Sequence, residues 1–230
     1  CGNHSEAVIP LPNWGEMRQC ADCGLFFADP MTLPMTSEEL YTKAYNGKGD
    51  GEAGDFSKFA NKLRYRREQL QVRRYLLPPT SLRTLKWLQL NLPQGATIME
   101  IGCGPGYFMH TLRRNGFKAI GIEPGEKPAS ILKEEGFQVW HGTLDNYPAD
   151  WPEPDAVVSF FMLHHLPDPG GFFTTLRRQF PNAPLILSES HTNTLLFATR
   201  RDLPGSLPPQ YFTWWTSQAV LSNLGRSPGI

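Results

Sequence analysis

From residue 96 onward, continuous apolar runs alternate with segments whose apolar residues recur at helical spacing. The apolar runs, typical of buried strands, lie at 96–101, 117–123, 137–142, 155–161 and 184–190. The helical segments lie at 107–116, 127–136 and 170–180, and Gly116 and Gly136 stand where helix C-caps are expected. Because strands that are apolar throughout must be covered on both faces, the pattern predicts an α/β fold with a mostly parallel, doubly wound sheet.

The first 93 residues follow a different pattern. Residues 1–30 contain no long periodic segment and are expected to form a small, loop-rich, ribbon-like module. Residues 31–93 turn helical and are predicted to be a linker or lid. The prolines at 78–79 are expected to end a helix in this lid. Residues 94–190 then form the sheet domain, and 191–230 a C-terminal segment on the substrate side. A basic stripe on the lid helix consists of Lys62, Arg66, Arg67, Arg73 and Arg74.

Composition limits the partners. The chain has 230 residues with 22 basic and 22 acidic side chains, so it has no net positive charge that would attract nucleic acid. The basic stripe is therefore interpreted first as a solvated helix face. No apolar run approaches the roughly 20 residues that span a bilayer. The first residues also lack the basic-then-apolar plan of a secretory signal, so we expect a cytoplasmic protein that does not enter a membrane.

The turn after the first strand carries the strongest chemical signal. In "IMEIGCGPGYF", residues 98–108, three glycines follow the strand tip, where ligands of doubly wound sheets bind. A phosphate-binding P-loop is excluded because Tyr107 and Phe108 stand where lysine and Ser or Thr are needed. A dinucleotide fingerprint is disfavoured by the G-x-G-x-G spacing and by Glu100, which would repel a pyrophosphate. The acid indicates a ligand that carries a cation.

The stretch from Glu100 to Gly106 resembles the first motif, E/D-x-G-x-G-x-G, of the class I S-adenosylmethionine-dependent methyltransferases. Further matches are Glu123 at the end of the second strand, "HGTLDNYP" after the third and "DAVVSFFMLHHLPDP" around the fourth. The resemblance implies a Rossmann-like fold and S-adenosylmethionine as cofactor. In such a site, the Glu123 carboxylate would accept hydrogen bonds from the ribose hydroxyls. The implied cofactor-binding residues are Glu100, Gly102, Cys103, Gly104, Pro105, Gly106, Glu123, Pro124, Thr143, Leu144, Asp145, Phe160 and Phe161; Cys103 is expected to pack beneath the cofactor.

Two adjacent histidines follow the fourth strand. A base is needed when the acceptor is a hydroxyl or a carbon acid, and imidazole suits neutral pH, so His165, with His164 beside it, is the candidate catalytic residue. The alternative is that both histidines pack the loop or contact the cofactor. A group of methyltransferases that this chain resembles has the motif L-E-H at this place. Here the sequence is Leu163-His164-His165, so the histidine of the motif is present and its acid is replaced by His164.

The N-terminal module contains the pairs Cys1-x-x-His4 and Cys20-x-x-Cys23. Their spacing suits tetrahedral zinc, which would replace the core that about thirty residues cannot build. A redox C-x-x-C pair is the alternative. "QCADCGLFFADP" also resembles the zinc-ribbon segment that precedes the methyltransferase domain in bacterial enzymes such as deoxysugar C-methyltransferases.

The leading prediction is therefore an S-adenosylmethionine-dependent methyltransferase that acts at carbon or oxygen of a small metabolite, such as a sugar nucleotide or a natural-product intermediate. Two alternatives stay open. One is an RNA methyltransferase that uses the zinc module and the basic stripe, with strongly salt-dependent binding. The other is a non-catalytic interaction protein that binds zinc or the cofactor.

Overall fold

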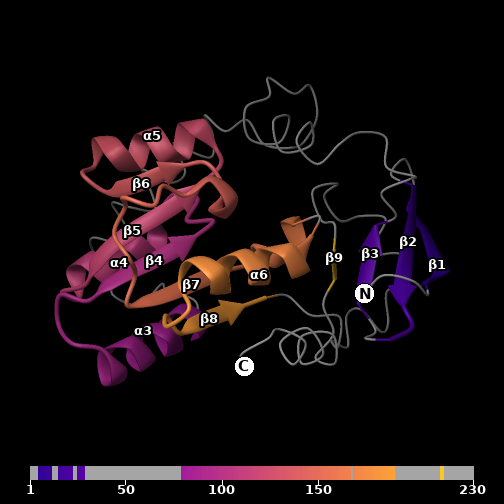
Figure 1. Ribbon diagram of the computed structural model, residues 1–230, viewed down its shortest axis with the longest axis horizontal. Coiled ribbons are helices and arrows are strands. Elements are labelled where there is room, and N and C mark those ends of the chain that lie inside the picture. Colours follow the sequence, from indigo (N-terminus) through magenta and orange to yellow (C-terminus); the bar gives the residue numbers. More distant parts are fainter. Residues whose placement is uncertain are drawn as a thin grey trace. The chain divides into compact units, whose positions relative to one another are not determined.

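The computed structural model describes residues 5–11, 15–22, 25–28, 79–166, 168–189 and 213–214 (Figure 1). They belong to two compact units. The sheet unit comprises the described residues of 42–160 and 176–188, and the ribbon unit comprises those of 1–41, 161–175 and 189–230. The boundaries predicted at 30, 93 and 190 stay predictions.

The sheet unit contains one parallel sheet of five strands. Their order is β6-β5-β4-β7-β8, and every neighbouring pair is parallel. The strand order reverses beside β4, so the crevice beyond its carboxyl end is where this topology binds ligands. The strands are β4 (Thr97–Ile101), β5 (Lys118–Glu123), β6 (Gln138–His141), β7 (Ala156–Phe160) and β8 (Leu185–Ser188).

The helices between these strands are α4 (Tyr107–Arg114), α5 (Glu126–Glu134) and α6 (Pro169–Gln179), as the sequence pattern predicts. Gly116 and Gly136 follow the C-caps of α4 and α5 in the left-handed region, with φ of 82° and 74°. The helix that the proline pair at 78–79 is expected to end lies outside the described residues, and a further helix, α3 (Pro79–Asn91), begins at Pro79. Proline suits a first helical position, whose N–H has no intrahelical partner.

Both faces of the sheet are covered. Successive strand residues point to opposite faces, and Ile98 and Met99 of β4 are both fully buried. The cluster around Ile98 includes Leu88 from α3 and Leu112 from α4. The predicted doubly wound, Rossmann-like arrangement is therefore confirmed for this unit.

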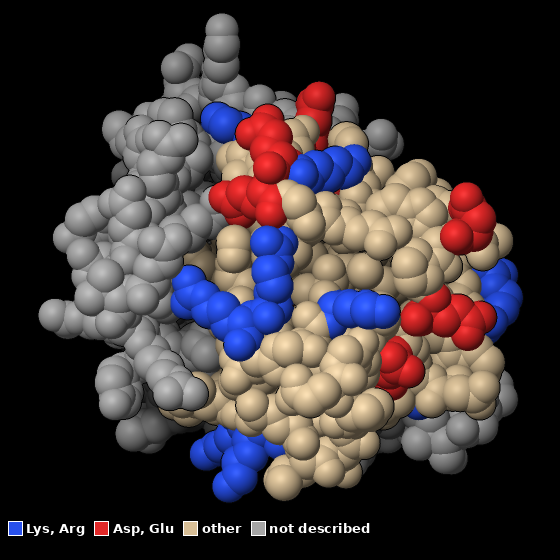
Figure 2. All heavy atoms as spheres, turned by 90° about the vertical axis from the view of Figure 1, so that its left-hand side faces the viewer, with Lys and Arg blue, Asp and Glu red and all other residues tan. Residues whose placement is uncertain are grey.

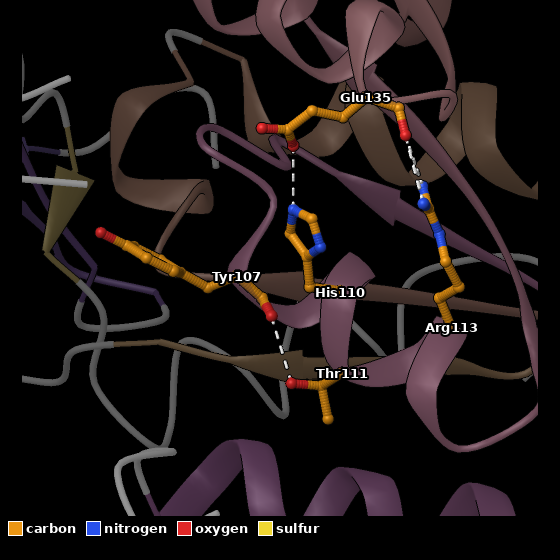
Figure 3. A network of polar contacts seen from close by, with 5 residues as sticks. All are labelled: Tyr107, His110, Thr111, Arg113 and Glu135. Atoms are coloured by element: carbon orange, nitrogen blue, oxygen red, sulfur yellow. Dashed lines mark hydrogen bonds and ion pairs between the residues drawn. The ribbon is translucent and has the colours of Figure 1, made fainter. Parts of the chain in front are cut away.

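Side-chain contacts join the helices α4 and α5 (Figure 3). The His110 Nε2 atom lies 3.0 Å from Glu135 Oε2, and the Arg113 guanidinium donates to the Glu135 carbonyl at 3.2 and 3.3 Å. The same guanidinium lies 3.3 Å from the ring centroid of Phe137. In α4, Thr111 Oγ1 donates to the Tyr107 carbonyl at 3.2 Å. These contacts fix α4, which begins directly after the glycine turn.

The ribbon unit contains an antiparallel sheet, ordered β1-β2-β3-β9. The region predicted to be a loop-rich, ribbon-like module at 1–30 thus contains three strands. The sequence of β1 gives a weak strand signal because it contains Pro10, and its pairing with β2 has a register shift between Ala7 and Ile9. The strands are β1 (Ser5–Leu11), β2 (Gly15–Cys20), β3 (Phe26–Ala28) and, from the predicted C-terminal segment, β9 (Thr213–Trp214).

Some predictions concern residues that the structure does not describe. Of the lid predicted at 31–93, the part at 31–78 lies outside the described residues, and so does its basic stripe. On the face in Figure 2, the basic and acidic side chains of the described residues are interspersed. Within the described part of the chain, no helix has the length and apolar character to cross a membrane. The cytoplasmic location stays a prediction.

Close packing at Gly121 gives a stability prediction. A Cβ atom on Gly121 would lie 2.7 Å from Cys103 Sγ and 2.9 Å from Met109 Sδ, so Gly121→Ala is expected to cost about 1–3 kcal/mol of unfolding free energy. Adding Cys103→Ala should recover part of this loss. Urea denaturation measures both effects.

The matched control is Gly170→Ala in α6, where the new Cβ would meet only Asp168 Oδ1 at 3.4 Å. This variant should be as stable as the wild type or gain roughly 0.5–1 kcal/mol, since alanine favours helix. Equal losses in Gly121→Ala and Gly170→Ala would contradict the packing argument.

Candidate functional site

The glycine turn between β4 and α4 is built from left-handed residues. Gly102, Gly104 and Gly106 have φ of 70°, 47° and 74°, values that residues other than glycine rarely adopt. The amides of Gly102 and Cys103 donate to the Ile122 carbonyl at 2.9 and 3.2 Å, so the turn is held against β5. A Cβ atom on Gly104 would meet nothing within 4 Å. Open space therefore lies beside this bare backbone.

Glu123, the last residue of β5, joins two turns. Its side chain is buried, Oε2 accepts a hydrogen bond from the Gly104 amide at 2.7 Å, and Oε1 accepts one from the Gly125 amide at 2.8 Å. Burial raises the pKa of Glu123 to about 7, although the hydrogen bonds from Gly125 and Gly104 oppose this shift. A carboxylate has about four acceptor positions, so Glu123 keeps acceptor capacity for a ligand.

Glu100 lies on the neighbouring strand β4 and is only 5% exposed. Its Oε2 atom is buried and has no hydrogen-bond partner among the described residues. Burial raises the pKa of Glu100 to about 8, a backbone hydrogen bond from Met109 lowers it in part, and the charge of Glu123 raises it further. A cationic ligand would remove this penalty, because an opposite charge favours the ionised carboxylate.

The remaining predicted residues of the first two turns are placed as follows. Cys103 is buried and packs among Met109, Leu132 and Val139. Burial, and then the charges of the two glutamates, hold the pKa of its thiol well above the ordinary value, so Cys103 does not provide a reactive thiolate. Pro105 and Pro124 are half-buried.

The loop after β6 turns through the short helix η1 (Leu144–Asn146). Thr143 and Asn146 form a capping box, in which the Thr143 amide donates to Asn146 Oδ1 at 2.9 Å. Leu144 is buried and its carbonyl accepts a hydrogen bond from Gln179 Nε2 at 2.9 Å, whereas Thr143 and Asp145 are exposed. The Gly142 amide donates to the Glu123 carbonyl at 3.1 Å. This loop therefore begins beside the end of β5.

Phe160 ends β7 and packs edge-on against Phe108 of α4, with ring centroids 4.9 Å apart. Phe161 follows in the ribbon unit. It is 45% exposed and has a φ of 53°, the left-handed region that a bulky residue avoids. Such backbone strain concentrates at functional sites.

The two histidines lie in the short helix η2 (Leu163–His165) of the ribbon unit. The rings of His164 and His165 have centroids 4.1 Å apart. His164 is buried, and its Nδ1 lies 2.7 Å from Glu189 Oε2, whereas His165 is half-exposed. The sequence did not identify Glu189, because it lies 25 residues away along the chain and ends an apolar strand pattern without a motif.

The structure thus brings together Glu100, the glycine turn, Glu123 and the start of the loop at 142–145 within the sheet unit. Within the ribbon unit it brings together the two histidines and Glu189. Each group supports part of the predicted chemistry, and the individual roles stay predictions.

The zinc prediction concerns residues that are mostly undescribed. Cys1, His4 and Cys23 lie outside the described residues. Cys20 ends β2, is buried, and its amide donates to the Leu25 carbonyl at 2.8 Å. Among the residues that the structure describes, no group of three or more His, Cys, Asp or Glu side chains could hold a metal ion. Zinc therefore stays a prediction without support from the structure.

A parallel sheet with a glycine turn and two strand-end carboxylates defines a cofactor-binding α/β protein. Comparison with known families identifies its kind: the model of a methyltransferase domain matches residues 65–224, more than half of the chain. The chain belongs to this methyltransferase family, and the predicted enzyme class is confirmed at that level.

Among curated proteins, the chain is similar to the ubiquinone biosynthesis O-methyltransferases of Proteus mirabilis and Pseudomonas fluorescens. The first is 30% identical over 33% of this chain and 34% of the relative; the second is 28% identical over 56% of this chain and 65% of the relative. The chain thus spans less than two thirds of the length of either relative.

Solved structures agree on the fold. A methyltransferase from Thermotoga maritima, described as S-adenosylmethionine-dependent and a possible histamine N-methyltransferase, is 24% identical and has a TM-score of 0.53, covering 74% of this chain and 77% of its own. A mycolic acid cyclopropane synthase complexed with SAH is 16% identical and has a TM-score of 0.50, covering 63% and 60% of the two chains. These likenesses support the Rossmann-like methyltransferase fold.

The raised pKa of Glu100 predicts how stability changes with pH. The ligand-free folded state keeps a proton on Glu100 up to about pH 8, whereas the unfolded chain loses it near 4.5, so the unfolding free energy should fall as pH rises through this window. The slope is at most about 1.4 kcal/mol per pH unit for each such group. Denaturant midpoints across the window measure it.

Glu100→Gln should flatten this slope, since the amide does not titrate. The exposed Glu153→Gln variant is the control and should keep the wild-type slope. A slope that is the same in all three proteins would contradict the assignment to Glu100.

Proposed function

We propose that the protein transfers a methyl group from S-adenosylmethionine to a hydroxyl oxygen of a small metabolite. The observation that carries the proposal is Glu100, a buried carboxylate with an unpartnered oxygen at the strand end beside the glycine turn. A buried acceptor without a partner costs free energy unless a ligand satisfies it. The ammonium group of S-adenosylmethionine has the charge and the donors that Glu100 lacks.

The residues of the first turn fit the rest of this cofactor. The space beside Gly104, which a Cβ atom would enter, lets a ligand lie against backbone. The Glu123 carboxylate already accepts hydrogen bonds from two amides. Its remaining acceptor positions would accept hydrogen bonds from the ribose hydroxyls. When bound, S-adenosylmethionine supplies a methyl group already activated by the sulfonium.

The adenine end would be held by the loop at Thr143, Leu144 and Asp145. The side chain of Leu144 is buried and offers an apolar contact, whereas the exposed Asp145 carboxylate can accept from an exocyclic amine. Phe160 and Phe161 would border the methionine end. The exposed ring of Phe161 offers an apolar surface near the point where β7 ends.

The protein's part in catalysis is alignment, exclusion of water and removal of a proton. His165 is the proposed base: a neutral imidazole would take the hydroxyl proton while the acceptor oxygen gains the methyl group. His165 is more exposed than His164, so a substrate can reach it more readily. His164 is already engaged with Glu189.

Two acceptor classes are supported by different observations. The curated relatives are named for O-methylation in ubiquinone biosynthesis, which favours a hydroxyl on a small molecule. The segment around Cys20 and the Leu163–His165 motif resemble those of sugar C-methyltransferases, which favours a sugar nucleotide. We give precedence to O-methylation because the curated relatives are named for it.

The first experiment is a calorimetric titration with S-adenosylmethionine, S-adenosylhomocysteine and NAD. We expect the first two to bind, and Glu123→Gln to weaken both about 10- to 100-fold, as for loss of hydrogen bonds to a charged group. Binding should release a proton near neutral pH, because the cationic ligand ionises Glu100. Repeating the titration in buffers of different ionisation enthalpy measures this release, and Glu100→Gln should abolish it.

Gly104→Ala tests the open space directly, since its methyl group would enter the proposed cofactor site. Gly136→Ala is the matched control: Gly136 is also left-handed, and its Cβ atom would likewise meet nothing within 4 Å. Both variants should lose roughly 1–2 kcal/mol of stability, but only Gly104→Ala should lose cofactor affinity. Binding of NAD alone would refute the proposed cofactor.

The proposed base predicts a turnover defect. With a panel of catechols and sugar nucleotides as acceptors, His165→Ala should lower kcat about 100-fold or more, while S-adenosylmethionine affinity stays nearly unchanged. Radiolabelled methyl transfer measures turnover. Full turnover in both His165→Ala and His164→Ala would show that neither histidine acts as the base.

A further inference from the structure

A further buried carboxylate, that of Glu189, directly follows β8. Its side chain is 7% exposed and lies next to the His164 side chain, which is 4% exposed. Taking a glutamate out of water costs free energy, so a buried carboxylate is retained where it has several donors or a function. The contacts of Glu189 show what it holds.

Three donors from one short segment converge on this carboxylate. Oε1 accepts hydrogen bonds from the amides of Met162 and Leu163 at 2.5 and 2.7 Å. Oε2 lies 2.7 Å from His164 Nδ1. The segment follows Phe161, whose left-handed backbone is strained. Glu189 therefore stabilises the turn that carries both the strained residue and the two histidines.

The contact also fixes the state of the His164 ring. An ionised carboxylate only accepts hydrogen bonds, so the proton must lie on Nδ1 of His164. In the neutral imidazole this leaves Nε2 as the basic nitrogen, as in sites where a carboxylate orients a catalytic or ligating histidine. The ring of His165 lies against this oriented ring, with centroids 4.1 Å apart. A change at Glu189 is thus transmitted to both histidines.

We propose that Glu189 is a positioning residue for methyl transfer: it fixes the turn at 161–165 and the Nδ1-protonated tautomer of His164, against which the base His165 is held. This inference rests on the proposed function for its catalytic consequence. The conformational part, the turn and the tautomer, depends only on the contacts among these residues.

The test compares Glu189→Gln, Glu189→Asp and His164→Asn with the wild type. Glu189→Gln should lower kcat with catechol as acceptor about 10- to 100-fold, as for other residues that orient a functional imidazole, while the affinity for S-adenosylhomocysteine changes less than about threefold. Glu189→Asp, which keeps the charge, should retain more activity. The double variant Glu189→Gln/His164→Asn should lose little more than either single variant.

A second readout needs no turnover. In nitrogen-15 spectra of the protein at alkaline pH, the neutral wild-type His164 should show a protonated Nδ1 and an unprotonated Nε2. Glu189→Gln should give a mixture of the two tautomers, whereas the exposed-residue control Glu153→Gln should keep the wild-type spectrum.

The outcomes separate the two proposals. Lower thermal stability in Glu189→Gln with unchanged kcat and tautomer would show a merely structural role and overturn the inference, as would a loss of S-adenosylhomocysteine affinity equal to the loss of kcat. If the wild type binds S-adenosylhomocysteine but methylates no hydroxyl acceptor of the panel, the acceptor class of the proposed function is wrong. The tautomer then decides the positioning role by itself.

Discussion

The pairing of Glu123 with the amides of Gly104 and Gly125 is the interaction on which the candidate site depends. It connects the turn after β4 with the turn after β5, and the Gly142 amide, bonded to the Glu123 carbonyl, adds the loop after β6. Hydrogen bonds to Glu123 therefore hold the chain at the ends of three adjacent strands, β4, β5 and β6. The buried position makes these hydrogen bonds stronger and the loss of any one more costly.

Glu100, on the neighbouring strand, differs from Glu123 in its hydrogen-bond partners. Glu123 and Glu189 are both buried, but backbone amides occupy each of their carboxylates. Glu100 keeps an unpartnered oxygen, and its pKa of about 8 is the highest of the two shifted glutamates in the sheet unit. The protein thus satisfies the carboxylates that build the turns and leaves unsatisfied the one that would meet a cation.

Much of the sheet unit could be predicted from sequence because its signals are local. Apolar runs, helical periodicity and the glycines at 116 and 136 lie within single elements, and the glycine turn joins adjacent elements. The individual strands of the ribbon-like module were not predicted, because they are short and β1 contains a proline and a register shift. The start of α3 was missed because proline marks helix starts as well as ends.

Glu189 could not be predicted for a different physical reason. Its importance arises only when the parallel pairing of β7 and β8 sets Phe160 opposite Ser188, since the next residues along the two strands are then Phe161 and Glu189. No spacing within the chain encodes that register. The carboxylate beside the His164 ring comes from position 189, which is 25 residues away along the chain.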